Sequence, residues 1–180
     1  EMCIRDRCKT CDGKGKIRRQ KTIEISVPAG IDDDQILNVG GKGNAGSNGG
    51  PNGDLHVYIT VRPHAIFTRR GNDVWCDMPI TFTQAALGAE VTVPTLDGKV
   101  SYTVHEGTQP GDVFKLKGKG IQSINGRGRG DQYVRVTVEV PKNLSKRQKE
   151  LLQEFEQNAD EKNYQKRKSF FGKIKDLFED

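Results

Sequence analysis

The stretch VPAGIDDDQILNVGGKGNAGSNGGPNGDLHVYITV, residues Val27–Val61, recurs 77 positions later as VHEGTQPGDVFKLKGKGIQSINGRGRGDQYVRVTV, residues Val104–Val138. The two segments align without a gap and are identical at twelve of 35 positions. A repeat of this length indicates two tandem copies of one small structural unit. Both copies end in alternating apolar and polar residues, which is typical of half-buried β-strands.

The same alternation predicts further strands on both sides of the repeat. In the first copy it covers Thr22–Val27 and Leu55–Val61. In the second copy it covers residues 91–93, 100–104 and 133–138, with a hairpin turn at Asp97-Gly98 and a short helix near residues 84–87. We therefore predict an all-β chain of two tandem small antiparallel β-sandwich domains, followed by a short helical segment.

Four parts are expected along the chain. Residues 1–21 form the end of a cysteine-containing module, residues 22–64 and 65–142 the two β domains, and residues 143–180 the helical segment. The second copy has strand-rich residues 72–103 before its aligned half, whereas the first copy has cysteines at that place. This difference predicts that the opening strands of the first domain lie upstream, and that the chain is a fragment of a longer protein.

Cys8 and Cys11 form the sharpest local motif, CKTCDGKG. Two thiolates two residues apart can hold one zinc ion, and the glycines let the backbone curl around the sulfurs. A redox pair or two free thiols are the alternatives. A structural zinc needs four protein ligands, so this motif supplies half a site. Cys3 does not repeat the spacing, and Cys76 lies in an alternating run that predicts a packed strand residue.

Charge and composition exclude several function classes. The net charge is +5, but residues 1–22 carry a net +5 by themselves, so the folded middle is close to neutral. Nucleic-acid binding is therefore disfavoured, despite the arginine–glycine loop at residues 126–130. No apolar run is long enough to span a membrane, the charged N-terminus is unlike a secretory signal, and a cytoplasmic location is expected. No nucleophile–base arrangement is present, so no catalytic residue is predicted.

The C-terminal tail carries two apolar groups at helical spacing. Ser145 to Gln148 reads as a capping box before the first group, Leu151, Leu152 and Phe155. The second group follows a polar stretch and consists of Phe170, Phe171, Ile174, Leu177 and Phe178. A segment this short is not a stable helix by itself, so it must dock on its own domain or on a second subunit.

Together these motifs resemble the C-terminal half of bacterial DnaJ proteins, the zinc-containing class of J-domain co-chaperones. The resemblance runs from about Cys8 to the end. It is carried by the CxxCxGxG motif and by VPAGI, GDLHVYITVRPHAIFTRRGNDV, ALGAEVTVPTLDG, KLKGKGI and SFFGKIKDLF.

The resemblance implies a role for each part. Cys8 and Cys11 belong to the last of four zinc motifs and form half of one zinc site. The β domains bind unfolded client polypeptides, with Ile23 and Val57 lining an apolar groove and Ile25 and Ile59 sharing their faces by alternation. The tail makes a homodimer, and a DnaK-type chaperone receives the client. No His-Pro-Asp tripeptide, the signature of a J domain, occurs in the sequence.

Two other function classes stay open from the residues alone. One is a zinc-dependent nucleic-acid-binding module, suggested by the basic N-terminus and the arginine–glycine loop. The other is a thiol oxidoreductase acting through Cys8 and Cys11. A steep loss of affinity with salt would mark the first.

Overall fold

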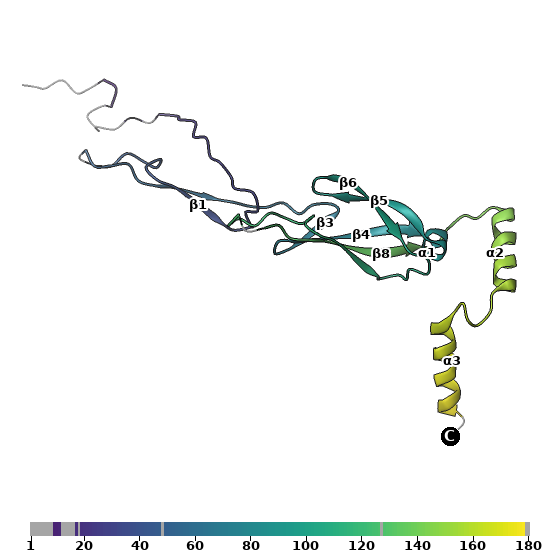
Figure 1. Cartoon of the computed structure of the whole chain (residues 1–180). Helices are drawn as coiled ribbons and strands as arrows, with labels where there is room; N and C mark the ends of the chain where they lie inside the picture. The colour runs from purple at the N-terminus through teal and green to yellow at the C-terminus, as the bar shows by residue number, and fades with distance from the viewer. Residues whose placement is uncertain (1–8, 12–16, 18, 48, 127, 179–180) are drawn as a thin grey trace, which may run out of the picture. The chain divides into compact units, whose positions relative to one another are not determined.

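The computed structural model describes residues 9–11, 17, 19–47, 49–126 and 128–178, with the side chains of 175–178 excepted. Most of the regular structure is β-strand, with three helices in the described part (Figure 1). The elements in chain order are β1 Ile36–Val39, β2 Leu55–Tyr58, β3 Phe67–Arg70, β4 Asp73–Thr81, α1 Phe82–Leu87, β5 Ala89–Thr95, β6 Gly98–Val104, β7 Val113–Leu116, β8 Gln132–Glu139, α2 Lys146–Asn158 and α3 Gln165–Phe178.

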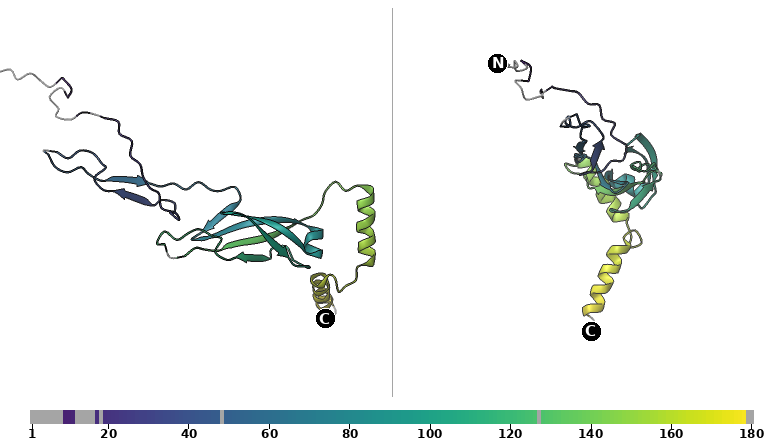
Figure 2. Two further views of the ribbon diagram at one scale, coloured as in Figure 1. Left: turned by 45° about the horizontal axis from the view of Figure 1, so that its top comes forward. Right: turned by 90° about the vertical axis from the view of Figure 1, so that its left-hand side faces the viewer.

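The strands form small antiparallel sheets. β1 and β2 pair with each other, β5 pairs with β6, and a four-stranded sheet has the order β3-β4-β8-β7 (Figure 2). The chain divides into two compact units: Glu1–Asp77, Pro94–Lys99 and Val113–Arg135 in the first, and Met78–Val93, Val100–Asp112 and Val136–Asp180 in the second. The predicted fold class, strands in small sheets with short helices, is confirmed.

The sequence repeat is reproduced in the strand pairing. In the first hairpin Ile36 pairs with Tyr58 and Val39 with Leu55. In the second, 77 positions later, Val113 pairs with Arg135 and Leu116 with Gln132. The two hairpins therefore have the same register. This is the structural meaning of the ungapped alignment, because a shift of one residue would move every side chain to the other face.

The loop of each hairpin is also built twice in the same way. The amide of Gly41 donates to Asp54 Oδ1 at 2.9 Å, and the amide of Gly118 donates to Asp131 Oδ1 at 2.7 Å. Backbone bonds from Gly43 to Gly53 (2.7 Å) and from Gly120 to Gly130 (2.8 Å) close the same loop.

Close backbone approach explains the second glycine of each Gly-Lys-Gly motif. A Cβ on Gly43 would lie 2.5 Å from the Asp54 carbonyl oxygen, and one on Gly120 would lie 2.6 Å from that of Asn72. No side chain fits at either position without moving backbone. The Gly-Lys-Gly sequences at residues 41–43 and 118–120 therefore serve the geometry of the turn.

The core of the second repeat is formed by alternate residues of the long strands. Every second residue of β4 is buried, from Val74 to Ile80, and β8 buries Gln132, Val134 and Val136. The other buried apolar side chains come from neighbouring strands and from α1: Ala85, Val93, Val104 and Leu116. Cys76 is buried in this layer as predicted, and burial raises the pKa of its thiol.

The first hairpin is more open. Leu55, Val57 and Ile59 are half-buried, whereas their counterparts Gln132, Val134 and Val136 are buried. The difference follows from the sheet order. β8 has β4 as a second neighbour, whereas β2 pairs only with β1 among the described residues.

The strand predicted at Thr22–Val27 is not formed, and this prediction was wrong. The segment has no regular secondary structure. Its counterpart in the second copy lies in β6 and pairs with β5. The residues 77 positions before β5 are 12–18, which overlap the CKTCDGKG motif and carry no strand pattern. An extended segment without a pairing partner has no ladder to join.

One arginine clamps several backbone carbonyls inside the first unit. The guanidinium of Arg69, in β3, donates to the carbonyl oxygens of Ile31 (2.6 Å), Gly30 (2.9 Å) and Gly71 (2.8 Å). It also lies 3.5 Å from the carboxylate of Asp32. These contacts tie the loop before β1 to β3, across almost 40 residues of sequence, and no motif in the sequence predicts them.

In the second unit, side-chain caps set the helix starts. Thr81 and Gln84 form a capping box at α1, close to the predicted helix, and Ser145 and Gln148 form one at α2, as predicted. Helix α3 begins at Gln165, four residues before the predicted stretch that starts at Ser169.

The two repeats predict unequal costs for the same substitution. Val134→Ala should lower the free energy of unfolding by about 2 kcal/mol, from two buried methyl groups at about 0.8 kcal/mol each plus the cavity left behind. The matched Val57→Ala change should cost less than about 1 kcal/mol, because Val57 is half-exposed. Urea unfolding followed by fluorescence of Trp75, the single tryptophan, measures both. Equal shifts of the unfolding midpoint would contradict the unequal burial.

Candidate functional site

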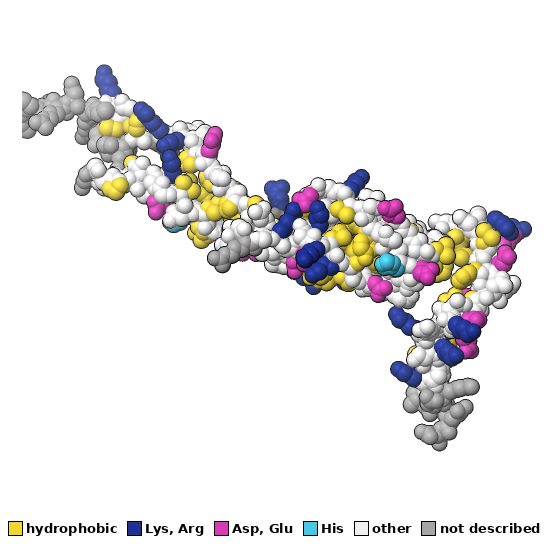
Figure 3. All heavy atoms as spheres, in the orientation of Figure 1, with side chains coloured by type: hydrophobic (Ala, Val, Ile, Leu, Met, Phe, Trp, Pro, Cys, Tyr) yellow, Lys and Arg dark blue, Asp and Glu magenta, His cyan; other side chains and the backbone are white. Residues whose placement is uncertain are grey.

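The clearest candidate surface is the face of the β1–β2 hairpin on which Leu37 and Val57 lie. Leu37 and Val57 are directly paired across the two strands, and both are half-buried. Ile59 follows two residues after Val57 on the same face by alternation. Its amide donates to the carbonyl of Gln35 at 2.9 Å, which extends the pairing beyond β2. Figure 3 shows apolar side chains reaching the surface in the part of the chain that carries β1.

The four predicted groove residues lie in two different segments of the chain. Val57 and Ile59 lie on one face of β2 and its continuation. Ile23 and Ile25 are also half-buried and alternate with exposed neighbours, but they lie in a segment without a strand. Sequence reasoning did not include Leu37 and Val39, whose half-buried side chains alternate along β1. The alignment with Phe114 and Leu116 in β7 was the signal that could have found them.

The edges of this hairpin matter as much as its face. In the four-stranded sheet, β8 lies between β4 and β7. Because β2 is the counterpart of β8 in the sequence repeat, the edge of β2 away from β1 corresponds to the edge of β8 that pairs with β4. This free edge of β2 has no strand partner among the described residues. An open edge beside an apolar face can accept an added strand, because unpaired backbone groups provide the hydrogen bonds.

The described residues do not by themselves provide a zinc site. Cys8 lies outside them, and Cys11 is half-buried and not in a disulfide. No group of three or more histidine, cysteine, aspartate or glutamate side chains placed to hold a metal occurs in the described part of the chain. The described residues therefore do not by themselves supply the four ligands that a structural zinc requires.

The arginine–glycine loop is held by internal contacts. Arg129 makes two hydrogen bonds to the carboxylate of Asp97, at 2.7 and 2.9 Å, and one to the carbonyl of Gly120 at 2.6 Å. Lys119 lies 3.7 Å from the same carboxylate. The Arg129 guanidinium holds the pKa of Asp97 below its usual value. With Arg129 already paired, this side chain gives little support to the nucleic-acid-binding alternative.

The apolar residues of the tail are mostly at the surface. In α2, Leu151, Leu152 and Phe155 are exposed, although the ring of Phe155 meets that of Phe82 edge-on at 6.2 Å. In α3, Phe170 and Phe171 are 60% and 56% exposed and contact each other, and Ile174 is half-buried. The side chains of Leu177 and Phe178 lie outside the described residues. Exposed phenylalanines on two successive helices form a surface suited to docking.

Comparison with known proteins identifies the class to which this architecture belongs. Residues 4–141 match the family described as DnaJ C terminal domain, and residues 147–180 match the one described as Chaperone protein DnaJ C-terminal region. The chain belongs to the DnaJ C-terminal domain family.

Similar relatives are bacterial proteins named Chaperone protein DnaJ. The one from Ruminiclostridium cellulolyticum is 58% identical over 95% of this chain and 49% of its own length. Those from Acetivibrio thermocellus and Bacillus cytotoxicus are each 53% identical, over 96% and 97% of this chain and 45% and 46% of their lengths. The chain thus spans about half the length of these relatives. In its described residues, no helix combines the length and apolarity needed to cross a membrane.

Proposed function

We propose that this chain is the client-binding and dimerising region of a cytoplasmic DnaJ-type co-chaperone. It binds apolar segments of unfolded proteins, which a DnaK-type chaperone then receives. The observation that carries this proposal is the half-exposed apolar face of the β1–β2 hairpin, where the second repeat buries the same positions. Membership of the DnaJ C-terminal domain family supports the same role.

The mechanism is binding without catalysis. An extended client segment adds as a strand at an edge of the hairpin, and its backbone forms ladder hydrogen bonds. Every second client side chain then lies over Val57 and Ile59 and removes their apolar surface from water. Main-chain bonds accept any sequence, whereas the apolar face selects apolar side chains. Such selectivity suits a protein that binds many unfolded chains.

Client binding can be tested by placing a charge on the apolar face. Val57→Asp should weaken binding of a fluorescein-labelled apolar peptide by about tenfold or more, because an unpaired carboxylate is costly to desolvate. Ile23→Asp should act in the same direction. Tyr58→Asp is the matched control, since Tyr58 is adjacent in β2 but on the opposite, exposed face. Fluorescence anisotropy measures all three, and undiminished affinity in both Val57→Asp and Ile23→Asp would place the groove elsewhere.

The exposed apolar residues of α2 and α3 are proposed to form a homodimer. Burial of a phenylalanine or leucine side chain contributes about 1.5–3 kcal/mol. The five residues of the α3 stripe therefore supply about 7–15 kcal/mol per chain, against about 4–15 kcal/mol for association. The margin is small, so the α2 residues Leu151, Leu152 and Phe155 must contribute, although Phe155 is partly covered by Phe82.

Sedimentation equilibrium tests the dimer. The whole chain should sediment with twice its monomer mass of 20.0 kDa, and a version ending at Lys168 should sediment as a monomer. Phe171→Asp in the whole chain should also favour the monomer, since it places a charge in a stripe that the proposed dimer buries. If truncation leaves the mass unchanged, the α3 stripe packs within its own subunit and the dimer proposal is wrong.

Zinc is proposed to bind this chain only weakly. Two thiolates leave half of the coordination sphere to water. After dialysis against a mild chelator, metal analysis of the monomeric fraction should give well under one zinc per chain. A Cys8→Ser, Cys11→Ser double variant provides the baseline. Stoichiometric zinc that resists the chelator in that fraction would contradict a half-site.

A further inference from the structure

The outer face of the four-stranded sheet carries a ladder of stacked side chains in the first unit. The ring of Trp75 in β4 stacks on Tyr133 in β8, with centroids 4.8 Å apart and planes 14° from parallel. The guanidinium of Arg70 in β3 lies 4.6 Å from the Trp75 ring centroid. Because β3 and β8 flank β4 on opposite sides, Arg70 and Tyr133 cover opposite faces of the indole. Lys115 extends the ladder over Tyr133 at 5.9 Å.

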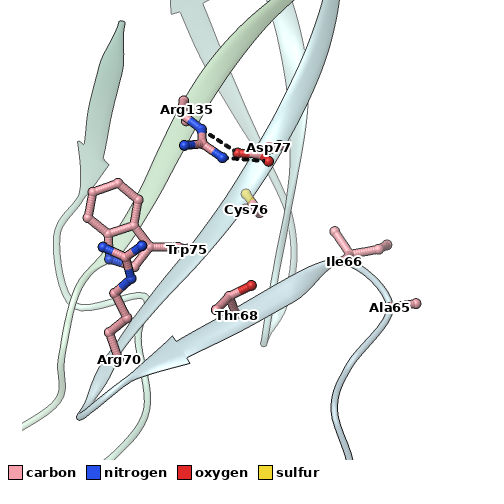
Figure 4. Close-up of a pocket in the computed structure, with 8 residues that line it drawn as sticks. All are labelled: Ala65, Ile66, Thr68, Arg70, Trp75, Cys76, Asp77 and Arg135. Atoms are coloured by element: carbon pink, nitrogen blue, oxygen red, sulfur yellow. Dashed lines mark hydrogen bonds and ion pairs between the residues drawn. The ribbon is translucent and has the colours of Figure 1, made fainter. Parts of the chain in front are cut away.

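A hollow of about 360 Å³ lies beside this ladder (Figure 4). The Arg70–Trp75 stack bounds it on one side, and Ala65 and Ile66 bound it on the other. The remaining lining comes from three strands: Thr68, Cys76, Asp77 and Arg135. The hollow is large enough for one or two side chains of a bound ligand. None of its lining residues belongs to the apolar face of β1–β2.

Two of the charged side chains around the hollow form an ion pair with each other, whereas Arg70 is unpaired among the described residues. Arg135 donates two hydrogen bonds to Asp77, at 2.7 and 2.8 Å, and this contact holds the pKa of the Asp77 carboxyl below its usual value. The Asp77–Arg135 pair is therefore neutral as a whole. Arg70 has no ion pair with any described residue. Its cross-strand neighbour Asp73 uses one carboxylate oxygen to accept the amide of Asp131, at 2.8 Å.

Among the described residues, the hollow also offers free hydrogen-bond donors, while its carboxylate acceptors are already engaged. Both oxygens of Asp77 are engaged, whereas the guanidinium of Arg70 presents N–H donors that meet no acceptor among the described residues. The indole N–H of Trp75 also has no acceptor there. Donors next to an unpaired positive charge favour a ligand that brings acceptors and a negative charge. A carboxylate meets both needs, since the guanidinium fork matches its two oxygens.

The apolar residues that line the hollow further restrict the class of ligand that fits it. Ile66 is 53% exposed and lines the hollow together with Ala65. A free carboxylate such as acetate would leave this surface uncovered, whereas a polypeptide with an acidic residue next to an apolar one would cover it. Stacking of Trp75 between Arg70 and Tyr133 holds the wall rigid before binding, so little side-chain freedom is lost.

We propose that this hollow is a second peptide-binding site, which takes an aspartate or glutamate side chain on Arg70 and an adjacent apolar side chain against Ile66 and Trp75. It differs from the proposed client site in both place and chemistry, and it does not depend on that site. The partner is an acidic segment of a polypeptide.

Trp75 makes the test direct because it is the single tryptophan of the chain. The probes are two acetylated, amidated pentapeptides with leucines around a central glutamate or glutamine. Titration of the whole chain with the glutamate peptide should give a saturable change in Trp75 fluorescence. The glutamine peptide should bind at least about tenfold more weakly, because the charged hydrogen bonds are lost. Acetate at equal concentration should give no comparable change.

Arg70→Gln should weaken the glutamate peptide at least about tenfold and leave the glutamine peptide unaffected. Arg70→Lys should be intermediate, since it retains the charge but loses the flat stacking and the fork. The matched control is Arg147→Gln on α2, which removes the same charge from a helix that contributes no residue to the hollow and should change neither affinity. Equal affinity for the two peptides, an equal response to acetate, unaltered binding by Arg70→Gln, or no binding at millimolar peptide would each overturn the proposal.

Discussion

A two-stranded hairpin cannot bury its own apolar face, and this constraint governs most of what the chain does. Two strands give one layer, and a stable β structure needs further strands or a second layer against it. The second repeat satisfies the requirement within the chain, because β4 pairs with β8 and Val134 and Val136 become buried. The first repeat has the same register and the same loop but lacks this cover among the described residues. Val57 and Ile59 therefore stay only half-buried, and the proposed client site uses the apolar surface that they leave exposed.

The repeats share the devices that shape the hairpin and differ in the side chains that surround it. Asp54 and Asp131 accept the same loop amide, and the crowded glycines Gly43 and Gly120 occupy the same position. The outer faces, in contrast, have diverged. Tyr133 and Arg135 of the second copy align with His56 and Tyr58 of the first. The stacked ladder and the hollow beside it thus belong to the second repeat alone, while the open apolar face belongs to the first. The two repeats therefore share a backbone structure but present different side chains at their surfaces.

The helices of the tail show the same dependence on a partner surface. A side-chain capping box sets the start of α2, and both helices contain good helix-forming residues. Their apolar groups remain largely exposed, apart from the edge contact between Phe155 and Phe82. A short amphipathic helix gains most of its stability by docking its apolar side. The exposed apolar side chains of the tail are therefore suited to docking on another chain, as the proposed homodimer requires.

The sequence by itself determined the repeat, its offset, the fold class, the buried alternation around Val74 to Met78, and the capping box at Ser145. These follow from patterns with short periods, which neighbouring residues enforce locally. Only the tertiary structure decided that Thr22–Val27 does not form a strand, because a strand exists only where a partner strand pairs with it. It alone placed Arg69 on distant carbonyls and stacked Arg70 on Trp75. Such contacts join residues on different strands or distant loops, and their side chains meet only when strand order and register bring them side by side.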